Sequence, residues 1–262
     1  MSEEHKEYLR RLKRRSMLIK LAQAGLLLLF FGLWELFAYY EIIDPFLTSS
    51  PSRVINSIYN LYLSDALFIH MKATLAETML SFALSTFLGT LIAVILWWNE
   101  TIRRILEPYI IVLNALPKIA LGPLIIIWAG AGKKAIIVMA LLICIIITII
   151  SMLTGFLSIE KGKMQLLQSM KANKFQILYK LVLPGNIPTL VSVLKINVGL
   201  SWVGTIMGEY LVSREGIGYL LVYGSQIFKL DLVMASTILL CVLATAMYLI
   251  VALAEKIIKR MY

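Results

Sequence analysis

Six long apolar stretches are the feature of this sequence that most constrains its fold. They cover about residues 21–40, 73–98, 105–129, 134–157, 187–212 and 232–255. Each is close to the roughly 20 residues that a helix needs to cross a bilayer. A backbone inside lipid finds no hydrogen-bond partner there, so each stretch is predicted to be a helix. We therefore expect an all-α, polytopic integral membrane protein with six transmembrane helices.

Composition excludes the water-soluble classes of protein. Apolar residues make up 60% of the chain and charged residues 15%, against about 45–50% and about 25% in soluble domains. This excess cannot be hidden inside one soluble core, and it also excludes a disordered chain. The two cysteines, Cys144 and Cys241, lie inside apolar stretches, where they act as small hydrophobic residues. With only two histidines beside them, no metal site is expected.

The chain is expected to fold as a single transmembrane domain, residues 21–262, after a basic N-terminal segment, residues 1–20. The apolar stretches leave short loops and no room for a second soluble domain. The first stretch follows basic residues, as the apolar part of a signal peptide would. It is long for that role, contains Glu35 and lacks a small-residue cleavage site, so we expect it to be kept as the first span.

Lysine and arginine are unevenly distributed over the predicted loops. The side of the membrane that includes both termini carries 17 of these residues, and the other side carries six. An even number of spans places both termini on one side, and the basic excess assigns that side to the cytoplasm. The net charge of +10 is therefore mainly a topology signal. The chain has no basic soluble face with exposed aromatic residues, so nucleic acid is not expected as a partner.

Motifs of soluble enzymes are missing from the sequence. Residues 130–134 contain the glycine and lysine of a phosphate-binding loop but lack its first glycine and its serine or threonine. Gly216 and Gly218 lack the third glycine of a dinucleotide-binding fingerprint. No HExxH, CxxC or GxSxG pattern occurs. We therefore expect no catalytic residue and no ATPase site in this chain.

The longest predicted cytoplasmic loop, about residues 160–186, is amphipathic. Its apolar residues alternate with glutamine, lysine and serine at near-helical spacing, which predicts two short helices with a turn near residues 172–174. Leu183-Pro184 and Pro188 end this segment and begin the fifth span, since proline suits only the first turn of a helix. Spacing alone leaves two interpretations open: the helices lie on the membrane surface or fit a groove on a cytoplasmic partner.

This loop resembles the cytoplasmic EAA loop of ABC importer permeases, whose pattern is E-A-A-x-x-x-G, about nine residues, and a hydrophobic-x-L-P ending. The resemblance assigns the ATPase-coupling loop to Gln165, Leu166, Leu167, Met170, Lys171, Ala172, Leu183 and Pro184. The first three stand where the family has Glu-Ala-Ala, and the last two match its ending. Lys171 stands at the family's glycine, where positive φ is uncommon for another residue. Either Lys171 adopts it, or the turn shifts to Ala172-Asn173.

Two further stretches carry the same resemblance. Residues 114–130, NALPKIALGPLIIIWAG, resemble the P-x-I-A-x-x-P-L…W-x-G stretch of nitrate/sulfonate/taurine-type importer permeases. Residues 208–219, GEYLVSREGIGY, resemble the end of the fifth span and the external loop in the same group. Because the three motifs occur in the right order and spacing over about residues 60–262, the chain is identified as a member of this type I group.

The resemblance implies a type I ABC importer permease fold in the bacterial plasma membrane. It also implies three kinds of partner: a second permease copy, most simply as a homodimer, cytoplasmic ABC ATPase subunits, and an external solute-binding protein. ATP and Mg would act in the ATPase, with no cofactor in this chain. Such a permease couples a conformational equilibrium to the ligand states of its partners.

Polar, ionisable, small and proline residues within spans are candidates for the translocation pathway or its gate, since ionisable residues in spans usually face protein or water and prolines permit kinks. They are Asn114, Pro117, Lys118, Pro123, Asn197, Ser201, Gly204, Gly208 and Glu209. Lys118 would favour an anion if it faces the pathway, and the alternative is a salt bridge to Glu209 or another acid. The small residues also suit helix packing within one subunit.

The group that the chain resembles implies a small organic anion of the sulfonate, taurine or nitrate type, or a vitamin precursor, as the solute. Two other functions fit the spans by themselves. One is a stand-alone secondary transporter or channel, which would need no ATPase. The other, more distant, is an integral-membrane enzyme, which would require clustered catalytic carboxylates, histidines or cysteines at the membrane surface. The sequence shows no such cluster.

Overall fold

The structure is a computed structural model that describes residues 3–261. The 17 basic residues assigned above to the side of both termini include five whose side chains lie outside the described part of the structure: Lys6, Arg10, Lys13, Lys259 and Arg260. Every regular element in the described residues is a helix. This agrees with the all-α class predicted from the apolar stretches.

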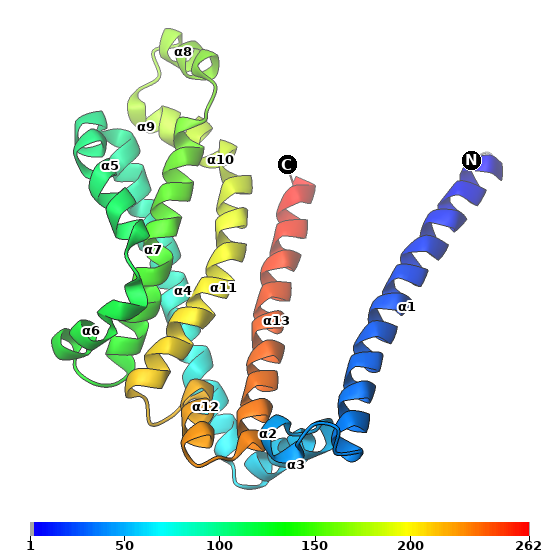
Figure 1. Cartoon of the computed structure of the whole chain (residues 1–262). Helices are drawn as coiled ribbons and strands as arrows, with labels where there is room; N and C mark the ends of the chain where they lie inside the picture. Colours follow the sequence, from blue (N-terminus) through cyan, green and yellow to red (C-terminus); the bar gives the residue numbers. More distant parts are fainter. Residues whose placement is uncertain (1–2, 262) are drawn as a thin grey trace.

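The long helices correspond to the predicted spans. Five are long and apolar enough to cross a bilayer: α1 (Glu3–Tyr39), α4 (Ala66–Trp98), α7 (Lys133–Leu157), α11 (Ile187–Val212) and α13 (Leu230–Met261). Shorter helices join them: α2 (Pro45–Thr48), α3 (Pro51–Leu63), α8 (Lys161–Ser169), α9 (Lys174–Ile177), α10 (Leu183–Gly185) and α12 (Ile217–Gln226). Both termini lie at the same end of the molecule as α8, which we call the α8 end; the opposite end is the α12 end (Figure 1).

The predicted third span is sharply bent. α5 (Glu100–Ala115) is followed by the 3-10 turn η1 (Lys118–Leu121) and by α6 (Gly122–Ala129), and the two halves meet at 90°. Pro117 offers no N–H to a helix and moves the residue before it out of the helical region, so Leu116 is extended, with ψ 137°. The kink predicted here is present. The structure thus has five spans, or six if the bent pair counts as one.

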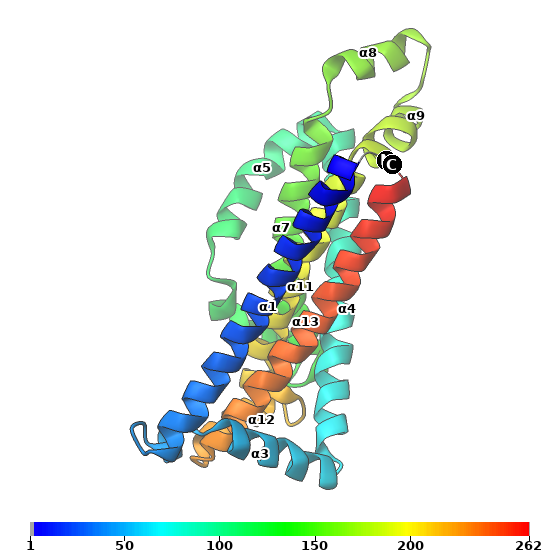
Figure 2. The same cartoon turned by 90° about the vertical axis from the view of Figure 1, so that its right-hand side faces the viewer.

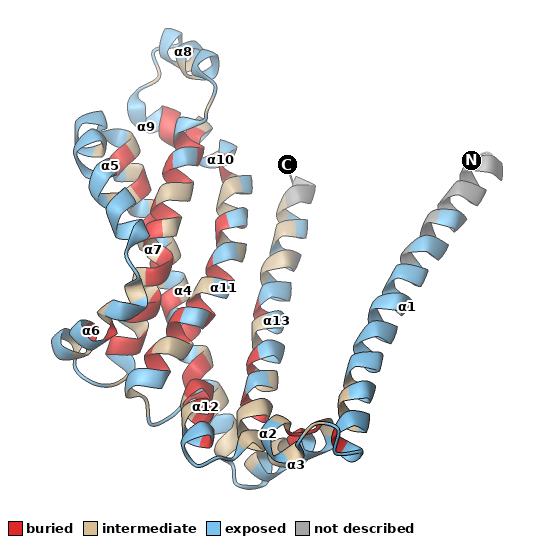
Figure 3. Ribbon diagram, in the orientation of Figure 1, coloured by how far each residue is buried: buried red, intermediate tan, exposed pale blue. Residues whose placement is uncertain are grey.

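α4, α7 and α11 form the packed centre of the molecule (Figures 1 and 3). Glycines let these helices approach closely, which matters in lipid because association depends on van der Waals packing. A Cβ added at Gly89 of α4 would lie 2.6 Å from the Thr148 Cβ, and one at Gly204 of α11 would lie 2.4 Å from the Ala140 Cα. Both glycines therefore pack against neighbouring helices of the same subunit, which is one of the two interpretations that the sequence left open for Gly204.

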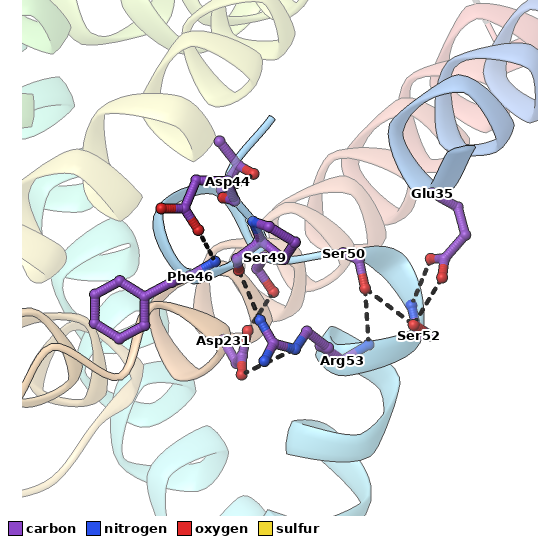
Figure 4. Close-up of polar contacts among 10 residues, drawn as sticks. Glu35, Asp44, Phe46, Ser49, Ser50, Ser52, Arg53 and Asp231 are labelled. Atoms are coloured by element: carbon purple, nitrogen blue, oxygen red, sulfur yellow. Dashed lines mark hydrogen bonds and ion pairs between the residues drawn. The ribbon is translucent and has the colours of Figure 1, made fainter. Parts of the chain in front are cut away.

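α1 stands apart from this centre and diverges from α13 toward the α8 end (Figure 1). No part of its most apolar window is buried. Polar contacts at the α12 end attach it to α3, and the α2–α3 segment is in turn attached to α13 (Figure 4). Glu35 of α1 accepts hydrogen bonds from the N–H and the hydroxyl of Ser52 at 2.9 and 2.8 Å. Ser49 donates to Asp231 of α13 at 2.7 Å, and Arg53 lies 4.0 Å from the same carboxylate.

Candidate functional site

α8 projects beyond the helical bundle (Figures 1 and 2). Two apolar side chains of this segment point away from the protein: Leu166 is 62% exposed and Met170 is 71% exposed. Leu167, by contrast, packs against the buried cluster that α4, α7 and α11 share with α9. The segment therefore has an apolar outer face, formed by Leu166 and Met170, and an inner side that contacts the core.

The turn between α8 and α9 is built around Lys171. Its φ of +60° lies in the left-handed region that favours glycine. The Lys171 N–H bonds to the Gln168 carbonyl at 2.9 Å and the Ala172 N–H to the Leu167 carbonyl at 3.0 Å, which is the Schellman arrangement at a helix C-terminus. Asn173 then caps α9 in a capping box. Of the two predicted outcomes, Lys171 has taken the glycine conformation, at a cost of about 1–2 kcal/mol.

The part of the loop after this turn is anchored in the core. Ile177 of α9, together with Leu178 and Val182 of the π-helical turn η2 (Leu178–Val182), is buried in the same cluster as residues of α4 and α7. α10 (Leu183–Gly185) continues directly from η2, and the helix ends at Gly185, one residue after Pro184; α11 then starts at Ile187 with Pro188 in its first turn. The predicted boundary before the fifth span is therefore present.

Four of the predicted pathway residues lie together on the bent arm formed by α5, η1 and α6. Asn114, Pro117 and Pro123 are exposed, and Lys118 is partly exposed. Lys118 donates a hydrogen bond to the backbone carbonyl of Asn114 at 3.2 Å. The alternative of an ion pair with Glu209 is not present in the described residues. None of the described residues of α5 is buried, so the arm presents this polar corner on a surface.

The other five predicted pathway residues lie in the packed centre of the protomer. All five are buried residues of α11: Asn197, Ser201, Gly204, Gly208 and Glu209. Asn197 donates hydrogen bonds to Thr86 of α4 at 3.1 Å and to Thr148 of α7 at 2.8 Å. These contacts join α11 to its two neighbours. A pathway role for the five residues stays a prediction.

The contacts of Glu209 explain why the motif of residues 208–219, which joins α11 to α12, contains a glutamate and two later glycines. Its side chain is 1% exposed and accepts hydrogen bonds from the Thr74 hydroxyl at 2.7 Å and the Gly218 N–H at 2.6 Å. Thr74 in turn accepts the Ile217 N–H at 2.8 Å. Gly216 has φ +107°, and a Cβ there would lie 2.3 Å from a Glu209 carboxyl oxygen. We call this arrangement the Glu209 cradle: a buried carboxyl group held by a loop that needs glycine.

Sequence patterns did not identify two residues of this cradle. Besides Thr74, His70 takes part, because its Nδ1 accepts the Gly216 N–H at 2.9 Å. The two lie one helical turn apart at the start of α4. That spacing was the only signal in the sequence that His70 and Thr74 act together. By itself it does not point to Glu209, which is 135 residues away from Thr74.

Comparison with known proteins finds relatives over most of the chain. The family model described as "Binding-protein-dependent transport system inner membrane component" matches residues 85–261. The formylaminopyrimidine transport permease protein ThiX of Halalkalibacterium halodurans is 31% identical over 188 residues, which cover 71% of this chain and 74% of ThiX. The taurine transport system permease protein TauC of Escherichia coli is 25% identical over 225 residues, which cover 84% of this chain and 82% of TauC.

A solved structure shares the fold. A chain of the MetNI methionine ABC transporter, in an inward-facing conformation, aligns with a TM-score of 0.67 at 20% sequence identity. The alignment covers 76% of this chain and 98% of that chain. At this identity the likeness concerns the fold alone, and it confirms the predicted all-helical membrane arrangement.

Proposed function

The chain belongs to the family of binding-protein-dependent transport system inner membrane components, and on that premise we propose that two copies of it form a pathway for a small organic anion or a vitamin precursor. As a member of this family, the chain is the permease subunit of an ABC importer, and the ATPase is a separate subunit. The observation that carries the proposal is the exposed apolar face of α8. A permease without its own ATPase needs a contact through which ATP-driven movement reaches it.

The α8 end is proposed to face the cytoplasm. Both described ends of the chain lie there (Figure 1), and the predicted loops of this side hold 17 of the 25 lysines and arginines. Such an excess is typical of cytoplasmic loops. This orientation, with both termini cytoplasmic, would place the α8–α9 loop where ATP is available and the Glu209 cradle on the outside.

α8 is proposed to be the segment that binds the ATPase. An amphipathic helix binds a partner by laying its apolar face into a groove. Leu166 and Met170 supply that face, and Phe175 and Tyr179, 64% and 67% exposed, extend the apolar surface along α9 and η2. Leu167 packs inward and so holds α8 in position. This favours a protein partner over the alternative in which the helices only rest on the membrane.

The separation of α1 supports a second copy of the chain as the next partner. Between α1 and α13 lies a cavity of about 510 Å³ that is mostly apolar. Its lining residues are Phe30, Leu33, Trp34, Phe37, Ile43, Leu47, Thr48 and Met234. The hydrogen bonds of Glu35 to Ser52 attach α1 at one end only, and its apolar length is left uncovered. Spans of a second copy would cover it; lipid is the other occupant, and the stoichiometry of the complex distinguishes the two.

The bent arm is proposed to contact the solute. Lys118 presents a cation at a polar corner that also contains Asn114, and an ammonium group suits a sulfonate or carboxylate. TauC and ThiX are named for taurine, which carries a sulfonate, and for a formylaminopyrimidine. The five buried residues of α11 would act through the packing that they provide.

Reconstitution tests the whole proposal. When the chain is purified with its ATPase, we expect a complex of two permease and two ATPase copies, measured by its mass in detergent. Liposomes that contain it should take up solute only when the binding protein is outside and ATP is inside. A complex with one permease copy would contradict the proposed dimer. Uptake by the chain without any ATPase would support a stand-alone transporter, and turnover of a chemical substrate would support a membrane enzyme.

Substituting methionine for Lys118 tests the anion preference. Lys118→Met keeps the length and apolar stem of the side chain and removes its charge, so the KM for uptake of an anionic solute should rise about ten-fold, as for loss of one charged hydrogen bond. Affinity of the isolated binding protein should stay unchanged. Lys118→Arg should retain most of the uptake, and the exposed Lys72→Met serves as a matched control. Unchanged uptake by Lys118→Met would remove the basis for an anionic solute.

A further inference from the structure

We call the segment from α8 to η2, residues 161–182, the docking loop. Lys174 joins this loop to the end of α4, although it is not part of the apolar outer face formed by Leu166 and Met170. It is the first residue of α9 and follows the turn at Lys171. Its Nζ donates a hydrogen bond to the backbone carbonyl of Trp98, the last residue of α4. The same nitrogen lies 5.9 Å from the centre of the Trp97 ring and 5.6 Å from that of the Trp98 ring.

Both contacts are favourable for a cation at the C-terminus of a helix. The last carbonyls of a helix lack partners within it and carry partial negative charge, which attracts a cation. The faces of indole rings attract it too. α5 starts directly afterwards, because the Asn99 side chain accepts the N–H groups of Thr101 and Ile102 at 3.0 and 3.1 Å. α4 and α5 therefore meet at a corner of a single residue, Asn99, and Lys174 is bound beside it.

The corner connects two helices that are packed very differently. α4 contributes Ala93 and Leu96 to the buried cluster at the α8 end. α5 has no buried residue in its described part and leads directly to the bent arm with Lys118. A displacement at the corner is therefore resisted more by the packing of α4 than by that of α5, which reaches the cluster only with the partly buried Ile110.

We propose that Lys174 is a positioning residue that ties the docking loop to the α4–α5 corner, so that movement of α8 reaches the bent arm. The apolar contacts of Ile177 and Leu178 hold α9 on the core without fixing a direction. The Lys174–Trp98 hydrogen bond is directional, and it is the one hydrogen bond between loop and corner in the described residues. The inference rests on the proposed contact of α8 with the ATPase.

The test compares three variants in the full complex, reconstituted in liposomes with the binding protein. For Lys174→Met, we expect the ATPase to remain bound and the solute imported per ATP hydrolysed to fall about ten-fold, since a charged hydrogen bond and a cation–π contact are lost. Lys174→Arg should restore most of the coupling ratio, because it keeps the charge and a donor. Lys180→Met removes another exposed lysine of the same loop and should match the wild type.

Three results would overturn the inference. One is an unchanged coupling ratio in Lys174→Met. Another is loss of the ATPase from Lys174→Met, which would make Lys174 a docking residue. A purely structural role would lower the amount of complex without changing the ratio of solute to ATP, and it too would contradict the proposal. Failure of the proposed function is recognised by a different variant. If the complex assembles equally well when the permease carries Leu166→Asp and Met170→Asp, the apolar face of α8 does not bind the ATPase, and the proposed function fails.

Discussion

Replacing Leu166 and Met170 together with aspartate is expected to abolish both binding of the ATPase and transport. The two side chains are exposed in the permease alone, so the substitutions should leave its fold intact. In the docked complex, each would place a carboxylate without a partner against an apolar groove. Burial of unpaired charge should weaken docking by about 4 kcal/mol in total, or about a thousand-fold in Kd.

The measurement is the amount of ATPase that co-purifies with the permease, followed by uptake into liposomes. Gln168→Asp is the matched control, because it adds an acid to an exposed polar position of the same helix and should leave docking intact. Leu167→Asp should instead lower the yield of folded permease, since Leu167 packs inward. Normal docking and transport by the double variant would show that the ATPase binds elsewhere.

Replacing Glu209 with alanine is expected to destabilise the α12 end strongly. The Thr74 hydroxyl and the Gly218 N–H would lose their common acceptor in a buried site. Leaving two buried donors unpaired should lower the free energy of unfolding by about 3 kcal/mol. Glu209→Gln keeps one acceptor oxygen, so its loss should be intermediate. Gly216→Val should be comparably damaging, because its Cβ would collide with the Glu209 carboxyl group.

Unfolding of the purified protein in detergent, followed by circular dichroism, measures this loss. Glu215→Gln is the control: it is a neighbouring acid whose ion pair with Lys133, at 3.5 Å, is exposed. Exposed pairs contribute little, so the change should stay below about 0.5 kcal/mol. Equal stability of Glu209→Ala and the wild type would show that the cradle does not hold the loop.

The spans and the docking loop could be predicted from sequence because their signals are local. Apolar length alone predicts a membrane helix, and the alternation of residues 166–178 predicts short amphipathic helices without knowledge of neighbours. Pro117 likewise predicts a break. The 90° size of that break could not be predicted, because it depends on how little of α5 is held by other helices.

The polar residues of α11 show where such reasoning stops. Small and polar residues are needed both along a pathway and where helices approach closely, so Asn197 and Gly204 fit either role in the sequence. Only their neighbours decide: Asn197 bonds to Thr86 and Thr148, and Gly204 lies against Ala140. The contact of Lys174 with Trp98, 76 residues apart, is likewise invisible in any local pattern.

By itself, the sequence determined that this chain is a helical membrane protein, which segments are long and apolar enough to cross the bilayer, and which loop is amphipathic. The bilayer imposes those features on each segment separately, through apolar length and backbone hydrogen bonding. The tertiary structure decided which polar side chains face a surface and which are packed, how far α1 diverges, and what holds the Glu209 cradle. These depend on contacts between residues far apart in the chain, and a local pattern is compatible with several such partners.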